Sequence, residues 1–199
     1  MARLQGKNIL IIIPKDYYAE EEFDPLLPVL KEEGANVLVA SQKLKLAVGM
    51  KSGRYMPDLL VVDSIEGITG DSYVTGGRGT RQVKGVFHGV VLIGGSGARK
   101  YIWNDKLVRL LIVDRYKSGM VVGALGTAVP TLCNAGMTGQ LEISAARDKK
   151  TLQELDKTNT HVSDNPVSVE NRIITAEGGA HVEQFAETFI QEVAKTPVK

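Results

Sequence analysis

The segment from Gly119 to Pro130, Gly-Met-Val-Val-Gly-Ala-Leu-Gly-Thr-Ala-Val-Pro, has the pattern of a buried strand that runs into a sharp turn and a helix. Many α/β enzymes carry a nucleophile at such a turn, because the tight backbone exposes the side chain at its apex. Here the turn carries Gly126 and Thr127. Glycine has no group that can ionise or attack, and a threonine hydroxyl needs a neighbouring base. Covalent thiol catalysis at this turn is therefore not expected.

An acidic segment, residues 20–24, could bring a base to the same turn. Ligands of open α/β sheets gather at the carboxyl ends of the strands, and this segment follows the first predicted strand. Asp24 or Glu21 would be the base, or the hydrogen-bond partner of the turn. The alternative is that the segment is a solvated helix start, where acidic side chains interact favourably with the helix dipole.

A glycine-rich loop, residues 94–97, could supply hydrogen-bond donors. The backbone N–H groups of Gly95 and Ser96, together with that of Thr127, could stabilise an oxyanion, although the loop also fits a plain tight turn. A dinucleotide-binding fingerprint requires a third glycine where this chain has Lys100, and the Walker spacing is absent as well. We therefore expect no nucleotide cofactor, and no other cofactor is indicated.

The histidines and the single cysteine offer no further catalytic centre. His88, His161 and His181 show no paired spacing of metal ligands, so no metal site is expected. His181 follows a Glu-Gly-Gly loop that could border the site, and it joins the candidate pocket residues. Cys133 lies about two helical turns beyond Gly126 and is interpreted as a small buried residue. The alternative, a redox sensor, requires an exposed thiolate.

Composition narrows the class of protein. The chain has 199 residues, 43% of them hydrophobic, which favours one domain over residues 1–199 with a substantial core. Its 24 basic and 23 acidic residues nearly cancel, so we expect neither a nucleic-acid nor a membrane partner. The apolar run at residues 9–13 is too short to span a bilayer, and one cysteine is compatible with the reducing cytoplasm.

Alternating strand and helix patterns predict the architecture. Continuous apolar runs indicate strands buried on both faces, and the segments between them have helical spacing. This alternation predicts a mostly parallel, doubly wound sheet, with a hairpin-bearing excursion between residues 41 and 88. Expected strands cover residues 8–13, 36–40, 59–62, 72–75, 89–93, 120–125, 141–145 and 172–175, and expected helices cover 23–34, 104–118, 127–135 and 180–194.

The order and spacing of several segments resemble the ThiJ/PfpI family over nearly the whole chain. The segments that carry the resemblance are Ile9-Leu-Ile-Ile-Ile13, the acidic segment leading to Leu26-Leu-Pro28, Leu30-Lys-Glu-Glu-Gly34, Val37-Leu-Val-Ala-Ser41, Val90-Val-Leu-Ile-Gly-Gly95, Ala124-Leu-Gly126 and Arg172-Ile-Ile-Thr-Ala-Glu-Gly-Gly179. The resemblance implies a flavodoxin-like three-layer sandwich of the class I glutamine amidotransferase type, and a homodimer or higher homo-oligomer. Members of the family include glyoxalase-like, peptidase-like and hydratase enzymes and redox-responsive chaperones.

The resemblance also implies that this chain lacks the family's cysteine. Matched from the preceding strand, the cysteine position falls on Gly126, whereas matching through Pro130 places it on Thr127. The family's acidic partner falls on Asp24 by its spacing to Pro28, with Glu21 one helical turn earlier.

Two hypotheses follow. In the first, the protein has no thiol-dependent catalysis and acts by binding a small molecule or as an oligomeric stress or chaperone-like protein. In the second, it is a noncovalent glyoxalase-, hydratase- or hydrolase-like enzyme that uses Asp24 or Glu21 with a backbone oxyanion hole. The candidate catalytic groups are Asp24, Glu21 and Thr127, and the candidate pocket residues are Gly95, Ser96, Gly126, Thr127 and His181.

Overall fold

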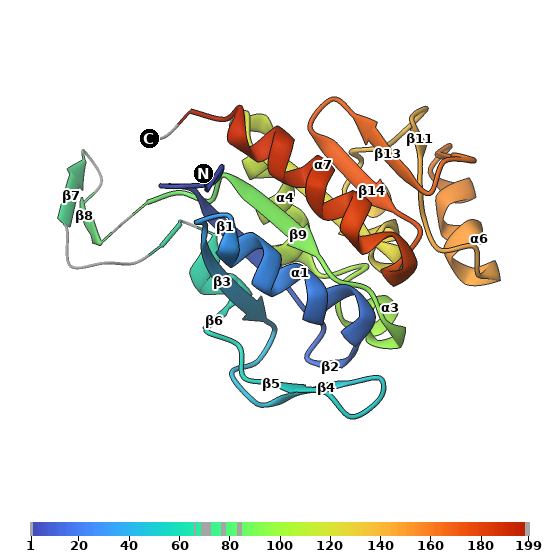
Figure 1. The fold of residues 1–199 in the computed structure, drawn as a ribbon, viewed down its shortest axis with the longest axis horizontal. Helices are drawn as coiled ribbons and strands as arrows, with labels where there is room; N and C mark the ends of the chain where they lie inside the picture. The colour runs from blue at the N-terminus through green and yellow to red at the C-terminus, as the bar shows by residue number, and fades with distance from the viewer. Residues whose placement is uncertain (1, 66, 69–72, 77–78, 83–84, 198–199) are drawn as a thin grey trace.

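A computed structural model describes residues 2–65, 67–68, 73–76, 79–82 and 85–197. Its centre is a seven-stranded sheet (Figure 1). The strands β14, β10, β9, β1, β3 and β6 run parallel, and β13 pairs antiparallel with β14 at one edge. In sheet order these are β13 (Val167–Glu170), β14 (Ile173–Ala176), β10 (Val121–Leu125), β9 (Gly89–Leu92), β1 (Asn8–Ile12), β3 (Asn36–Ser41) and β6 (Leu59–Leu60).

Helices cover both faces of this sheet. One face packs against α1 (Glu20–Glu32) and α7 (Val182–Ala194), which lie side by side in Figure 1. The other face packs against a second apolar cluster with contributions from several helices, namely α2 (Val61–Ser64), α3 (Ser96–Tyr101), α4 (Lys106–Lys117), α5 (Pro130–Asn134) and α6 (Lys149–Lys157). The expected three-layer sandwich with a mostly parallel, doubly wound sheet is confirmed.

The alternation of side chains along β1 explains the two cores. Ile9 and Ile11 belong to the cluster beneath α1 and α7, whereas Leu10 and Ile12 belong to the cluster on the opposite face. Because successive side chains of a strand point to opposite faces, a continuous apolar run can be buried only between two layers. The run at residues 9–13 therefore specifies a central strand.

The excursion between residues 41 and 88 forms several small elements. A three-stranded sheet combines β2 (Asp16–Tyr18), β4 (Ala47–Gly49) and β5 (Arg54–Tyr55), and β7 (Tyr73–Gly76) pairs with β8 (Gly79–Gln82). The expected strand at 59–62 is only half correct, because α2 begins at Val61, whose side chain is buried in the core with Ala40. Residue 72 of the expected strand at 72–75 lies outside the described residues. The sequence Gly76-Gly-Arg-Gly79 also predicts a turn, of which residues 77–78 lie outside the described residues.

Three features differ from the expectations in ways that matter for the site. Helix α1 begins at Glu20, not residue 23, so the acidic segment forms its first turn. The expected helix at 127–135 divides into the short helix η1 (Gly126–Ala128) and α5. Helices α3 and α6 were not expected. Helix α3 is short and follows directly on the glycine loop.

The remaining elements are short. Strand β11 (Glu142–Ile143) pairs with β12 (His161–Val162), and η2 (Gly179–His181) leads into α7. Every helix in the described part of the chain is too short or too polar to cross a membrane.

Strand order places a crevice where the site was expected. The chain passes from β1 to β3 on one side and later to β9 and β10 on the other, so the direction of winding changes between β1 and β9. Ligand sites of open α/β sheets lie at such switch points, beyond the carboxyl ends of the strands. The loops that follow β1, β9 and β10 meet at this edge.

Candidate functional site

A cavity of about 360 Å³ lies beyond the carboxyl ends of β9, β10 and β14. We call it the Gly126 pocket. Four candidate residues, Gly95, Ser96, Gly126 and Thr127, line it, and so does Glu21. Other lining residues include Glu22, Met50, Arg99, Asp148 and Glu177.

Gly126 occupies the apex of the turn after β10. Its φ is +52°, in the left-handed region that favours glycine, and it follows Leu125, the last residue of β10. A Cβ atom built on Gly126 would overlap Oε1 of Glu22, so a side chain here would require the carboxyl group to move. The geometry favours Gly126 over Thr127 as the apex, since Gly126 is the residue that faces a carboxyl group.

Glu22 is the carboxylic acid that fills this space. It is only 3% exposed, and its Oε2 accepts a hydrogen bond of 2.6 Å from the N–H of Gly94. Burial raises the pKa of Glu22 to about 8, the Gly94 N–H lowers it in part, and the charge of Glu21 raises it further. Glu22 is therefore protonated at neutral pH, and because Oε2 accepts from Gly94, the proton resides on Oε1, beside Gly126.

The three consecutive glutamates of the first turn of α1 have three different environments. Glu20 is 8% exposed and accepts hydrogen bonds of 2.8–3.0 Å from the backbone N–H groups of Met50, Lys51 and Gly53. Burial opposes ionisation of Glu20, but these N–H groups outweigh it and hold its pKa below the ordinary value. Glu20 is thus a carboxylate that ties the turn between β4 and β5 to α1.

Glu21, by contrast, is solvent-exposed, and its carboxylate lies 3.4 Å from the ammonium of Lys51. The three neighbouring glutamates therefore differ because their environments differ: Glu20 is a charged structural group, Glu21 a surface charge and Glu22 a neutral acid.

Thr127 is bonded to the glycine loop. Its Oγ1 donates to the carbonyl of Gly95 at 2.8 Å and accepts from the N–H of Gly95 at 2.9 Å, and its own carbonyl accepts from Trp103 Nε1 at 2.5 Å. This hydroxyl connects two loops and has its proton engaged by a carbonyl. The same contacts occupy the Gly95 N–H, one of the donors expected for an oxyanion, while the Ser96 N–H donates to Met50 Sδ at 3.3 Å.

Asp24 and His181 lie outside the lining of the Gly126 pocket. Asp24 lines a separate surface hollow with Pro25 and the 51–53 turn, so Glu22 rather than Asp24 faces residue 126. His181 Nε2 lies 3.8 Å from Oε2 of Glu177, at the edge of the site.

The two other histidines and the cysteine do not line the Gly126 pocket, and His161 lines a different hollow. His88 is fully buried just before β9, at the opposite end of the sheet, where its Nδ1 accepts from the N–H of Asn8 at 3.0 Å. Cys133 is 3% exposed in the core on the far face of the sheet, and burial raises the pKa of its thiol. Within the described residues, no three His, Cys, Asp or Glu side chains are grouped so as to hold a metal ion.

Charged groups at the pocket rim are paired. Arg147 Nε donates to Glu177 at 2.7 Å. Arg99 lies over the ring of Trp103, 5.2 Å from its centroid, and its Nη2 is 3.4 Å from Oδ1 of Asp148. The rim is therefore polar, with both signs of charge.

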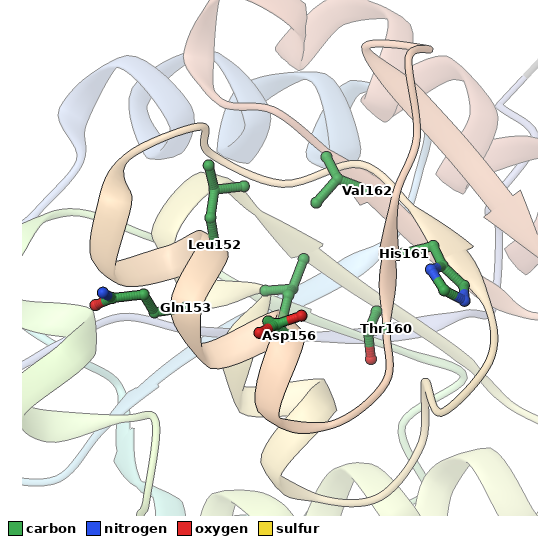
Figure 2. Close-up of a pocket in the computed structure, with 7 residues that line it drawn as sticks. Leu152, Gln153, Asp156, Thr160, His161 and Val162 are labelled. Carbon is green, nitrogen blue, oxygen red and sulfur yellow. The ribbon is translucent and has the colours of Figure 1, made fainter.

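A second hollow of about 440 Å³ lies between α6 and β12. Figure 2 shows that Gln153 and His161, two of its polar side chains, point away from each other. Because the lining of this hollow includes neither of the loops beyond the carboxyl ends of β9 and β10, we regard the Gly126 pocket as the candidate site.

Sequence reasoning missed Glu22 because the proline spacing pointed to Asp24. Glu22, Leu26 and Leu30 are four residues apart and all buried, so helical periodicity extended backwards from the apolar side of α1 does identify Glu22 as the inward-facing carboxyl. Met50, Arg99 and Glu177 reach the pocket from three separate elements, and no local signal marks them.

Comparisons with known proteins agree with this fold. The model of the DJ-1/PfpI family matches residues 7–192. An uncharacterized protein of Methanocaldococcus jannaschii is 25% identical over 190 residues, which cover 96% of this chain and 83% of the relative. Two solved structures share the fold. A ThiJ/PfpI domain protein from Brachyspira murdochii has a TM-score of 0.79 and 20% identity, with 97% of this chain and 99% of that chain covered. Drosophila melanogaster DJ-1beta has a TM-score of 0.75 and 22% identity, with 96% and 91% covered.

Proposed function

The chain belongs to the DJ-1/PfpI family, and we propose that it acts by binding a small molecule in the Gly126 pocket, without the thiol-dependent catalysis that the family resemblance implies for its cysteine-bearing members. One observation carries the proposal. At the apex of the turn, the carboxyl group of Glu22 fills the space that a side chain of residue 126 would need, and it does so beside an open cavity.

Two further features support the absence of a replacement nucleophile. The Thr127 hydroxyl is engaged with both backbone groups of Gly95. Cys133 is buried in the other core, and burial raises the pKa of its thiol, which disfavours the reactive thiolate. The pocket therefore retains shape and polar groups but has no activated nucleophile.

A matched pair of variants tests the proposal. Ser96 is exposed and lines the pocket, so Ser96→Phe would fill the cavity, whereas Ser118→Phe places the same ring at an exposed position after α4. A panel of anionic, neutral and cationic fragments is screened by ligand-observed NMR. We expect hits that bind the unmodified protein and the Ser118→Phe variant but not Ser96→Phe. A panel without such hits would contradict the proposal.

The second candidate is noncovalent acid–base catalysis, with Glu22 in the role expected for Asp24 or Glu21. It is favoured by the raised pKa of Glu22, about 8, because general acids and bases work best with pKa values near the operating pH. Glyoxalase, hydratase and peptidase assays separate the two candidates. Background rates support a binding protein, whereas turnover lost in Glu22→Gln but retained in Cys133→Ser supports the acid–base enzyme.

We also propose a homodimer or higher homo-oligomer, as the family resemblance implies, and a cytoplasmic location, with which the single cysteine is compatible. Large apolar side chains are exposed on and beside the small β2–β4–β5 sheet, among them Tyr17, Leu46, Met50 and Met56. Burying such a patch against a second copy is favourable. Light scattering that yields the mass of one 21.5 kDa chain would contradict this part of the proposal.

A further inference from the structure

The Gly126 pocket contains hydrogen-bond donors that lack strong acceptors in the protein. The N–H of Ser96 donates to the thioether sulfur of Met50 at 3.3 Å, and sulfur is a weak acceptor. The guanidinium of Arg99 is held only weakly: its Nε is shielded from solvent and has no partner within the described residues, and its Nη2 reaches Asp148 only at 3.4 Å. The carboxyl group of Glu22 also lines the pocket, and its Oε1 is the oxygen that does not receive the hydrogen bond of the Gly94 N–H.

Two carboxylates of the pocket, Glu177 and Asp148, are in contrast already engaged, whereas the exposed Glu21 lies 3.4 Å from Lys51. Glu177 accepts from Arg147 at 2.7 Å. Asp148 caps α6, accepting from the backbone N–H groups of Lys150 and Thr151 at 3.1 Å each and from Thr151 Oγ1 at 2.5 Å. A ligand that provides hydrogen-bond partners for Ser96, Arg99 and Glu22 must therefore contribute acceptors rather than donors.

We propose that the Gly126 pocket binds a small carboxylate with a second acceptor oxygen on the neighbouring carbon, that is, a 2-oxo or 2-hydroxy acid. The inference rests on the proposed function and adds the chemical class of the ligand. The guanidinium of Arg99 binds the carboxylate, because charge-assisted bonds from arginine to carboxylate are strong and directional. The O–H of Glu22 donates to the second oxygen, and the Ser96 N–H exchanges the Met50 sulfur for a ligand oxygen.

The cavity and its charges fit this class. A volume of about 360 Å³ is within the range of small-molecule sites and accommodates an acid of a few carbon atoms. A cationic ligand would meet the Arg99 guanidinium and a neutral acid, whereas the lining carboxylates Asp148, Glu177 and Glu21 lie beside Arg99, Arg147 and Lys51. Met50 is half exposed on the turn between β4 and β5, so its side chain can move aside.

Binding should depend on pH through Glu22. The charged groups around it are Glu21 on its own helix, Arg99 on α3, Asp148 before α6, and Glu177 after β14. Raising the pH through the pKa of Glu22, about 8, removes the donor and places a negative charge beside the ligand. The affinity for a carboxylate should therefore fall as the pH rises through this range.

The experiment uses the whole protein, with pyruvate as the probe and with acetate and ethylammonium as comparisons. At neutral pH we expect pyruvate to bind at least about tenfold more tightly than acetate, because it makes one more hydrogen bond, and ethylammonium not to bind. Arg99→Met should weaken pyruvate binding at least about tenfold, whereas the control Arg109→Met, on α4 outside the pocket, should leave it unchanged.

The variant Glu22→Gln separates the hydrogen bond that residue 22 donates to the ligand from the negative charge that Glu22 gains on ionisation. The amide retains an N–H donor, so this variant should bind pyruvate at neutral pH but lose the fall in affinity at alkaline pH. Equal binding of pyruvate and acetate, binding of ethylammonium, or an Arg99→Met variant with full affinity would overturn the inference. If the fragment panel identifies pocket ligands of another class, the inference fails and the proposed function stands; if nothing binds in the pocket, the proposed function itself fails.

Discussion

Replacing Glu22 by glutamine should change how the stability of the protein depends on pH. In the folded protein, burial raises the pKa of Glu22 from 4.5 to about 8, whereas the unfolded chain has the ordinary value. Between these two values the folded state binds one more proton than the unfolded state, so the free energy of unfolding falls as the pH rises. The stability contributed by the protonated group is fully present below pH 4.5 and is lost as the pH passes about 8.

The magnitude follows from the difference between the two pKa values. One pKa unit corresponds to about 1.36 kcal/mol, so a rise from 4.5 to about 8 corresponds to a loss of at most about 5 kcal/mol across this range. This loss is a large fraction of the free energy of unfolding of a typical folded protein, which is about 5–15 kcal/mol. Glu22→Gln keeps the shape and an acceptor for the Gly94 N–H but cannot ionise, so it should lack this loss.

Urea unfolding at a series of pH values measures the effect. Other titrating groups contribute equally to both proteins, so the quantity of interest is the stability of Glu22→Gln minus that of the unmodified protein. This difference should grow steadily between about pH 5 and 8, by about 1.4 kcal/mol per pH unit at its steepest. Glu21→Gln, the neighbouring exposed glutamate, is the matched control and should show no such growth. Parallel pH profiles for Glu22→Gln and the unmodified protein would refute the reasoning.

Three further predictions concern the surroundings of the site. Gly126→Ala should destabilise the protein by about 1–2 kcal/mol because of the left-handed backbone alone, and by more because its Cβ displaces Glu22. In a Glu22→Ala background this additional loss should vanish. A double-mutant cycle measured by urea unfolding tests this, and an additional loss that persists would contradict it. Glu20→Gln should cost about 1–3 kcal/mol and speed amide exchange at Met50, Lys51 and Gly53, and unchanged exchange there would count against Glu20 as the group that holds this turn. Burial, and then the charges of Lys7 and Arg115, lower the pKa of His88, so as the pH falls the imidazole is protonated in the unfolded chain before it is in the folded protein. The free energy of unfolding should therefore decrease as the pH falls below about 6.5. It should decrease less in His88→Gln, and an equal decrease would show that other groups cause it.

Sequence patterns were sufficient for the architecture because each central strand carries its own evidence. The run at residues 9–13 is apolar at every position, and only a strand covered on both faces buries all of them. The excursion between residues 41 and 88 was harder to predict, since its short strands pair over only a few residues. At Val61, where β6 gives way to α2, the side chain enters the buried cluster that also contains Ala40, and no local pattern reveals this burial.

The candidate site was predictable in its backbone and less so in its side chains. The glycine loop and the turn at Gly126 follow strands directly, so their positions at the edge of the sheet follow from topology. Which of several acidic residues enters the crevice depends on the rotation of α1, and a shift of two residues along a helix turns a side chain to the other side. The positions of Arg99 and Met50 depend on tertiary packing alone.

The central claim is that Glu22 is a neutral acid beside the bare turn at Gly126, and the titration of its carboxyl carbon by ¹³C NMR tests this most directly. The Glu22→Gln spectrum assigns the signal. We predict a midpoint near pH 8, well separated from the other glutamates. A midpoint near the ordinary value of 4.5 would mean that Glu22 is a solvated carboxylate at neutral pH, and would contradict the account.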